Sequence, residues 1–248
     1  MDKVVIRSID FETTAKEPEN AEIIEIGVTD VVWFPSLKEA TIHAHGGRLY
    51  NAPKGIPVEV QAVHHIQPHM VAGMPACDDV TLKAMALGDM GHGAPMFLVA
   101  HNAEYERHWL TPEVCGDVYW IDTFKCALRI WEDAPGHSNQ VLKYHLGLGV
   151  LPDDLALPAH RAGPDTYVTA HILVKMLETQ RVSHLVHWTT LPRYYPTCPL
   201  KKHKGQRWAD IPADYLVWML RADKEMVGDD LKFAAQVELD ARRAPQSA

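Results

Sequence analysis

The sequence has no excess of basic residues. Its 24 lysines and arginines are outnumbered by 32 aspartates and glutamates, and the formal net charge is −8. This balance argues against a protein that coats nucleic acid non-specifically, because such binding depends on basic side chains that neutralise phosphates. It remains compatible with an enzyme that grips one chain end, since carboxylates that hold divalent cations also make the net charge negative.

Paired cysteines and long apolar runs are also missing. The four cysteines form no CxxC pair, and the chain opens with Met1, Asp2 and Lys3 rather than with a charged and then apolar signal segment. Reduced thiols and a cytoplasmic location are therefore expected. Charged residues or histidine interrupt every apolar stretch well before the length of about 18 residues that spans a bilayer. No membrane role is expected.

Several signatures of catalysis and metal binding are absent as well. The sequence contains no GxxxxGK[ST] phosphate loop, no GxGxxG and no GxSxG elbow. Its 15 histidines include His43, His45 and the pair His64 and His65, but no HExxH motif or cysteine pair accompanies them. These histidines therefore do not indicate a zinc site.

Strand and helix patterns follow one another in an order typical of an α/β protein. Apolar or alternating runs predict strands at residues 4–6, 23–33, 41–49, 96–100 and 120–121. Helical patterns follow at residues 122–131, 138–146 and 164–178. This layout predicts a mixed five-stranded sheet flanked by helices, with functional groups gathered at strand ends and on the facing helices.

The length of 248 residues suits one full-sized domain with a small appendage. Prolines, tyrosines and small residues become frequent near Thr189, which indicates a linker. We predict a main domain at 1–188, a linker at 189–198 and a small C-terminal α/β module at 199–248. Basic side chains beside an aromatic at 200–208 suit contact with nucleic acid, although a solvated hairpin fits them equally well.

Two acidic residues, Asp10 and Glu12, stand two positions apart at the end of a predicted strand, after the apolar run at 4–6. Side chains at this spacing point to the same side of a strand, so both carboxylates are available to one hard cation. An isolated DxE pair is more often a solvated turn. Its interpretation as a metal site therefore depends on the rest of the sequence.

Two further motifs supply that context. Glu106 lies on the first turns of a helix that directly follows the buried strand at 96–100, and His160 precedes Asp165 near the start of another predicted helix. Four acids and one base match phosphodiester cleavage with two metal ions about 4 Å apart. Magnesium prefers oxygen ligands, and histidine is suited to take a proton from water near neutral pH.

These motifs, in this order, resemble those of the DEDDh 3′→5′ exonucleases, a ribonuclease-H-like superfamily. The resemblance extends to residues 62–66, 120–131, 138–142, 202–205 and 215–218, which are similar to an exodeoxyribonuclease of that superfamily, so it covers nearly the whole chain. It implies a ribonuclease-H-like fold, two Mg²⁺ ions that Mn²⁺ can replace, and release of 5′-mononucleotides from single-stranded or duplex DNA 3′ ends. A role in DNA repair is the corresponding expectation.

Carried over by position, the resemblance makes Asp10, Glu12 and Asp165 metal ligands and His160 the general base. The fourth ligand falls on Glu106, where the family pattern has aspartate. The additional methylene extends the reach by about 1.5 Å, whereas magnesium demands strict geometry, so activity or metal preference could shift. Glu104 differs from Glu106 in helical phase and is expected to point elsewhere.

The resemblance also implies substrate-binding residues. Thr13 and Thr14 would face the terminal nucleotide, and His64 would lie in a loop that packs against the terminal base. Each threonine fits equally well as a turn former, and His64 fits equally well as a helix cap. Asn102 is expected to fix its own loop by hydrogen bonds to the backbone.

Two alternative functions remain open. The motifs fit a 3′→5′ exoribonuclease equally well, because both sugars present the same phosphate, and the likeness outside the motifs is what favours DNA. A protein of another class, which binds nucleic acid through a disabled metal site, is suggested by Glu106 alone. The intact His160 and Asp165 favour catalysis over this alternative.

Overall fold

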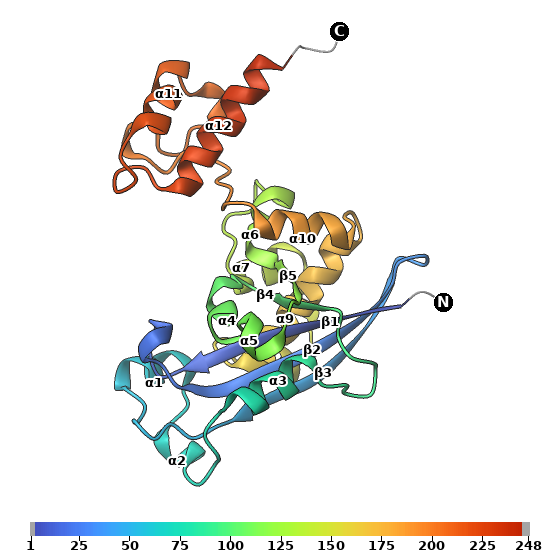
Figure 1. Ribbon diagram of the computed structural model, residues 1–248. Coiled ribbons are helices and arrows are strands. Elements are labelled where there is room, and N and C mark those ends of the chain that lie inside the picture. The colour runs from blue at the N-terminus through green and yellow to red at the C-terminus, as the bar shows by residue number, and fades with distance from the viewer. Residues whose placement is uncertain (1–2, 245–248) are drawn as a thin grey trace.

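The computed structural model describes residues 3–244 of the chain. Five strands form one sheet in the order β3-β2-β1-β4-β5. The strands are β1 (Val4–Thr13), β2 (Ile23–Phe34), β3 (Glu39–Leu49), β4 (Phe97–Ala100) and β5 (Tyr119–Asp122). β2 pairs antiparallel with β1 and β3, whereas β4 is parallel to β1 and β5 to β4. This arrangement confirms the predicted mixed five-stranded sheet (Figure 1).

Helices follow and flank these strands. Those before β5 are α1 (Val58–His64), α2 (Pro68–Val71), α3 (Asp79–Leu87), α4 (Glu104–Trp109) and α5 (Pro112–Cys115). Those after β5 are α6 (Thr123–Ile130), α7 (Asn139–His145), α8 (Asp153–Ala156), α9 (Ala162–Leu177), α10 (Val182–Thr190), α11 (Ala213–Arg221) and α12 (Asp229–Arg243). The three helices predicted from 122, 138 and 164 correspond to α6, α7 and α9, with ends that differ by one or two residues.

Caps explain where α6 and α7 begin. The side chain of Asp122 accepts a hydrogen bond from the backbone N–H of Lys125, and Ser138 accepts one from Val141. Each cap satisfies a backbone donor that has no partner within the helix. Asp122 therefore ends β5 and starts α6.

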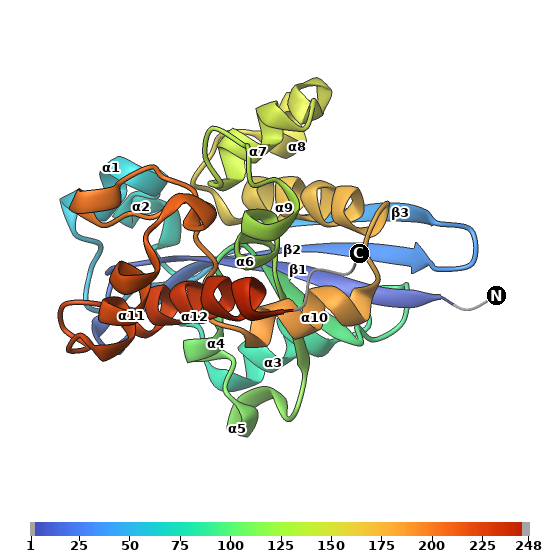
Figure 2. The same cartoon turned by 90° about the horizontal axis from the view of Figure 1, so that it is seen from above.

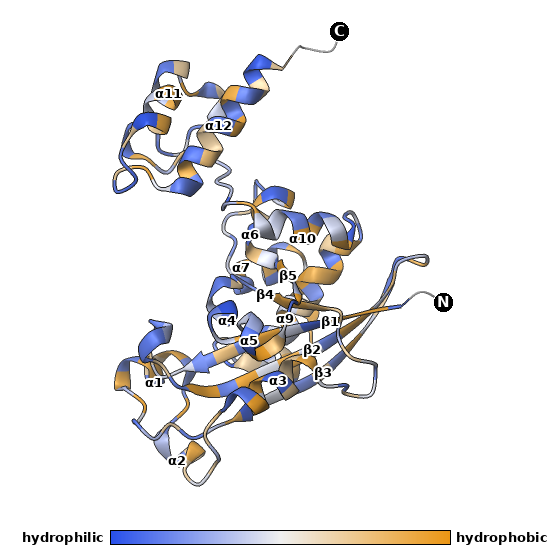
Figure 3. Ribbon diagram, viewed as in Figure 1, coloured by the Kyte–Doolittle hydropathy of each residue, from blue (hydrophilic) through white to orange (hydrophobic). Residues whose placement is uncertain are grey.

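The alternation of side chains along β1 divides the core between two faces of the sheet. Ile6 packs in the cluster that contains α9, whereas Ile9 and Phe11 pack in the cluster on the opposite face with α3 and α5. Asp10 and Glu12 share the parity of Ile6, so they extend the α9 face toward the end of the strand. Hydrophobic stretches run along the long strands, as Figure 3 shows.

Helix α9 packs across β1, β2 and β3 and approaches the sheet closely at its N-terminal end (Figure 2). Glycines make this approach possible. A Cβ atom added at Gly27 would lie 2.0 Å from the carbonyl oxygen of Ala162, and one at Gly163 would lie 2.7 Å from the backbone N of Gly47. The start of α9 is therefore brought directly onto the strands.

The C-terminal segment has a hydrophobic cluster of its own, which includes Cys198, Trp208, Leu216 and Ala235. Figure 1 shows it away from the sheet, connected through the segment after α10. The prediction of an α/β module was wrong in one respect, because residues 199–244 contain helices and only an isolated bridge, between Thr197 and Arg207. The reason is that apolar residues recur at helical spacing in α11 and α12.

Two further predictions concern the limits of this region. Helix α10 continues to Thr190 and so includes the first two residues of the predicted linker, and the hydroxyl of Thr189 donates to the carbonyl of Leu185. Residues 245–248 of the predicted module lie outside the described part. Within residues 3–244, no helix is both long and apolar enough to cross a membrane.

Candidate active site

Three carboxylates meet where β1 faces the start of α9. One oxygen each from Asp10, Glu12 and Asp165 lies within 4.8 Å of the others. Asp165 is held by its neighbours, because its Oδ2 accepts from the backbone N–H of His160 at 3.0 Å and its Oδ1 accepts from Gln140 Nε2 at 3.3 Å. The structure thus brings together three of the four predicted ligands from two elements.

Burial and mutual repulsion make these acids difficult to ionise. Burial raises the pKa of Asp10 well above its usual range, and the charges of Glu12 and Asp165 add to the effect. The pKa of Glu12 is raised to about 8, first by burial and then by Asp165 and Glu25. Clustered acids lose this repulsion when a divalent cation joins them. The oxygen-only donor set therefore fits a hard cation.

Glu106, the fourth predicted ligand, lies beside this cluster but outside the set of three. Its side chain is buried, and its Oε2 has no hydrogen-bond partner among the described residues. Burial, followed by the charges of Asp122 and Glu12, raises the pKa of Glu106 to about 8. Because buried polar atoms normally have a partner, this carboxylate oxygen also fits the role of a cation ligand.

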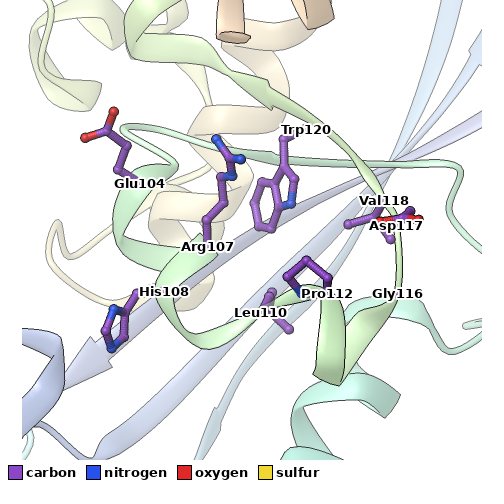
Figure 4. Close-up of a pocket in the computed structure, with 9 residues that line it drawn as sticks. All are labelled: Glu104, Arg107, His108, Leu110, Pro112, Gly116, Asp117, Val118 and Trp120. Atoms are coloured by element: carbon purple, nitrogen blue, oxygen red, sulfur yellow. The ribbon is translucent and has the colours of Figure 1, made fainter.

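Glu104, on the same helix, faces away from the cluster as predicted. Its side chain is 69% exposed, and a carboxylate oxygen lies 3.2 Å from Lys125 Nζ. Figure 4 shows Glu104 pointing away from the other residues of a cavity of about 450 Å³, which Arg107 and Trp120 also line. None of the clustered acids lines this cavity, so Glu104 is not positioned to replace Glu106.

An ion pair that the sequence analysis did not anticipate fixes the start of α9. Glu25, opposite Glu12 in the pairing of β1 and β2, is 2% exposed. It accepts from Arg161 Nε at 2.9 Å, from Arg161 Nη2 at 2.8 Å and from the backbone N–H of Ala162 at 3.1 Å. This bidentate contact ties β2 to the chain between His160 and Asp165. The available signal was a glutamate inside an otherwise apolar strand.

His160 lies at the mouth of the site. It is exposed and has a φ of 60°, and it lines a cavity of about 370 Å³ together with Asp10, Asn139, Asp165 and Arg193. Its ring is therefore accessible to a molecule that reaches the carboxylates. The role of general base stays a prediction for His160.

Two of the three predicted substrate residues line a second cavity, of about 630 Å³, on the other side of Glu12. Thr13 Oγ1 lies 2.6 Å from the hydroxyl of Tyr105, and His64 Nδ1 accepts from the backbone N–H of Ile66 at 2.9 Å. His64 Nε2 is buried without a partner among the described residues. Thr14 does not line this cavity.

Thr14 stabilises a turn instead, because its Oγ1 accepts from the backbone N–H of Glu22 at 2.8 Å. Asn102 adopts a left-handed φ of 77°, and its backbone N–H donates to Asp122 Oδ1 at 3.3 Å. Beside it, His101 Nε2 donates to the carbonyl of His137 at 2.8 Å, and burial lowers the pKa of His101 to about 4. His101 is therefore a neutral, hydrogen-bonded residue in the wall of the cavity that His160 also lines.

Comparisons with known proteins agree with this geometry. A family model described as exonuclease matches residues 8–173, which run from β1 into α9. The chain is also 30% identical over 222 residues to exodeoxyribonuclease 10 of Escherichia coli K12, covering 87% of this chain and 90% of that protein. The chain belongs to the DEDDh 3′→5′ exonuclease superfamily.

Solved structures of exonucleases share the fold. A structure of exonuclease X in complex with 5′ overhanging duplex DNA is 27% identical, with a TM-score of 0.58, and covers 74% of this chain and 99% of that one. The nuclease domain of 3'hExo, a DEDDh family member bound to rAMP, is 19% identical with a TM-score of 0.51, covering 70% and 92% respectively. At that identity the likeness concerns the fold alone. This exonuclease is thus a hydrolase with a ribonuclease-H-like sheet.

Proposed function

We propose that this exonuclease is a metal-dependent exodeoxyribonuclease that releases 5′-mononucleotides from the 3′ ends of DNA. The observation that carries the proposal is the set of carboxylate oxygens from Asp10, Glu12 and Asp165 within 4.8 Å of one another. Asp10 and Asp165 of this set line a cavity together with His160. DNA is favoured over RNA because the relatives named above are an exodeoxyribonuclease and an exonuclease in complex with DNA.

In this proposal Asp10, Glu12 and Asp165 hold two divalent cations, with Mg²⁺ as the physiological ion and Mn²⁺ as a substitute. Glu106 is the fourth ligand, and its unpartnered Oε2 supports this role. The cations would supply a more acidic water and neutralise charge on the phosphate. Neutralisation matters here because the site itself is acidic and would otherwise repel a phosphodiester.

His160 accepts the proton of the attacking water in this proposal. Histidine is the side chain best suited to exchange protons near neutral pH. The hydrogen bond from its backbone N–H to Asp165 holds the residue beside a metal ligand while its ring stays exposed. The Glu25 and Arg161 ion pair positions the same loop.

The terminal nucleotide occupies the cavity beside Glu12 in this proposal. Phe11, Val60 and Tyr105 offer apolar surface for a base, and Thr13 and His64 offer polar atoms next to it. Thr14 acts through the turn that it stabilises. Such a mixture of apolar walls and few polar groups is typical of small-ligand sites.

We further propose that the chain divides into the exonuclease domain at 1–188, a linker at 189–198 and a module at 199–248 that contacts DNA. The separate hydrophobic cluster of the C-terminal helices supports this division. Exposed Lys201 and Lys204, together with Lys202 Nζ at 5.0 Å from the ring centroid of Tyr215, support contact with a phosphate backbone.

The test is a shortening assay with 5′-labelled single-stranded, blunt and 3′-protruding DNA and a matched RNA, in magnesium or manganese. We expect stepwise loss from the 3′ end of DNA and a fall of about 100-fold or more in kcat for His160→Ala. His184→Ala, which changes an exposed histidine on α10, is the matched control and should retain the wild-type rate.

Three other results of the shortening assay would each contradict one part of the proposal. Faster shortening of the RNA would replace the proposed substrate with RNA. Binding without shortening of any oligonucleotide would contradict the catalytic proposal and make the disabled metal site the better interpretation. An unchanged rate for His160→Ala would remove His160 from its proposed role.

A further inference from the structure

Arg193, in the segment between α10 and the C-terminal helices, lines the same cavity as Asp10, His160 and Asp165. In the described part of the chain it is the one lysine or arginine among the residues that line this cavity. We propose that Arg193 binds a backbone phosphate of the nucleic acid, next to the phosphate that is cleaved. This inference rests on the function proposed above and assigns a second phosphate site to it.

Two aromatic rings hold the guanidinium in place. The Cζ atom of Arg193 lies 4.5 Å from the ring centroid of Phe124 and 4.9 Å from that of Tyr195. Its backbone N–H donates to Asp230 Oδ1 at 2.9 Å. Stacking uses the faces of the planar guanidinium and leaves the N–H donors along its edge available. Arg193 is therefore held in position, and no described residue accepts a hydrogen bond from its guanidinium.

The side chains of neighbouring basic residues have hydrogen-bond acceptors within the protein, whereas a side-chain donor of Arg193 has none among the described residues. Lys125 Nζ donates to the carbonyl of Leu191 at 3.3 Å, and Arg129 Nη2 donates to the carbonyl of Pro192 at 2.8 Å. These contacts secure the chain just before Arg193. In contrast, Arg193 Nε is buried and has no hydrogen-bond partner among the described residues. A buried donor without a partner is costly. The two Nη groups of Arg193 are not among the buried atoms and have no hydrogen-bond partner among the described residues, so they are the donors available to a ligand.

The chemistry of the site selects an anion with several oxygen acceptors. A guanidinium fork pairs with two phosphate oxygens at once. In the proposed function Asp10 and Asp165 would hold the cations that bind the phosphate that is cleaved, so a guanidinium elsewhere in the cavity would meet a different phosphate. A phosphodiester strand presents such phosphates at regular intervals and also needs an attractive charge opposite the acids.

The test compares Arg193→Met and Arg193→Lys with the wild-type full-length chain. The probe is a labelled oligodeoxythymidylate, with calcium in place of magnesium for binding and with magnesium for turnover. We expect Arg193→Met to raise Kd and KM about tenfold or more, while kcat changes by less than about threefold. The slope of log Kd against log salt concentration should become shallower by about 0.7, the value for one phosphate contact on a single strand.

Two further variants sharpen the test. Arg193→Lys keeps the charge but loses the fork, so it should restore the salt slope and only part of the affinity. Arg181→Met, which removes an exposed arginine at the start of α10, is the matched control. It should change neither the affinity nor the salt slope. A lower Tm for Arg193→Met with an unchanged salt slope would overturn the proposal, because Arg193 would then only pack the linker.

The outcomes also separate this inference from the function on which it rests. If the wild-type protein binds the oligonucleotide with an Arg193-dependent salt slope but does not shorten it, the proposed nuclease fails and the phosphate site stands. If the wild-type protein shortens DNA and Arg193→Met has an unchanged KM and salt slope, the phosphate site fails and the nuclease stands. If the wild-type protein neither binds nor shortens it, both proposals fail.

Discussion

Among the single residues of the site, Glu106 has the side chain whose length matters most. It approaches from α4 rather than from β1 or α9, and its Oε2 is buried without a partner in the described residues. If it holds a cation, its charge is essential and its length is adapted to the position of α4. The two properties can be separated by two substitutions.

We expect Glu106→Gln to lower kcat/KM for DNA by about 100-fold or more, because a ligand charge worth several kcal/mol is lost. Glu106→Asp keeps the charge and should remain within about tenfold of the wild-type value when manganese, the more tolerant ion, is supplied. Steady-state kinetics in both metals measures this. Glu104→Gln is the control, and a fully active Glu106→Gln would exclude Glu106 as a ligand.

The pKa values of the acids predict how pH and metal together affect stability. Without metal, the folded chain raises the pKa of Glu12 and of Glu106 from 4.5 to about 8. The folded state therefore keeps protons that the unfolded state releases, and the stabilisation present below pH 4.5 is lost as the pH rises through about 8. Bound divalent cations should remove this loss, because they favour the ionised carboxylates.

The measurement is the rise in Tm that magnesium produces relative to EDTA, at pH about 6 and at pH about 8.5. We expect a larger rise in Tm at the higher pH. For the double variant Glu12→Gln, Glu106→Gln, the rises at the two pH values should differ less than in the wild-type protein. Equal rises at both pH values in the wild-type protein would contradict the assignment of these two residues to a shared metal site.

The acids of the site were predictable because each carries a local signal, such as the spacing of Asp10 and Glu12 along a strand. Glu25 and Arg161 carry no such signal, since they are 136 positions apart and meet only when α9 packs on the sheet. Arg193 likewise gains its surroundings from α6 and from the C-terminal helices. Roles that arise from tertiary contacts were thus beyond local patterns.

At the scale of secondary-structure elements, the close packing of α9 on β2 and β3 determines whether the site forms. A methyl group at Gly27 would overlap the carbonyl oxygen of Ala162, which is backbone and cannot move aside easily. We expect Gly27→Ala to lower the free energy of unfolding by about 3 kcal/mol and to abolish nuclease activity, because Asp165 is displaced from Asp10.

Chemical denaturation and the shortening assay measure the two effects. Gly228→Ala is the control, because a Cβ atom there meets nothing within 4 Å and the residue precedes α12, far along the chain from the site. It should change the free energy of unfolding by less than about 1 kcal/mol. Wild-type activity in Gly27→Ala would show that α9 does not need this approach.

Long or capped elements were predictable, whereas short ones were not. The sequence predicted β2, α6, α7 and α9 to within a few residues, because their periodicity extends over several turns or pairs. Helices α2, α5 and α8 have four residues each, too few for a periodic pattern to register. Such short helices depend on packing rather than on intrinsic propensity.

At the scale of the whole molecule, the segment before α11 places lysines on the surface of an acidic protein. Lys201 and Lys204 are both exposed on this part of the chain. We expect the double variant Lys201→Ala, Lys204→Ala to raise KM for duplex ends by about threefold to tenfold and to make it less dependent on salt. Cleavage of a single nucleotide ester should be unaffected, because that substrate does not reach the module.

Kinetics on both substrates at two salt concentrations measure this effect. The double variant Lys224→Ala, Lys232→Ala is not a suitable control, because Lys232 Nζ donates to the carbonyl of Ala222. Arg181→Met, at the residue that precedes α10, is again the control because it removes a charge outside the module. An unchanged KM for duplex ends would leave the module without a role in DNA contact.

The order of elements along the chain also bears on synthesis. β1, β2 and β3 are consecutive and antiparallel, so a nascent chain can pair them by local contacts as soon as they leave the ribosome. Asp165 is carried by α9 and emerges after both remaining strands. If Asp10, Glu12 and Asp165 together hold the catalytic cations, as proposed, the growing polypeptide has no nuclease activity until α9 has been translated and has packed on the sheet.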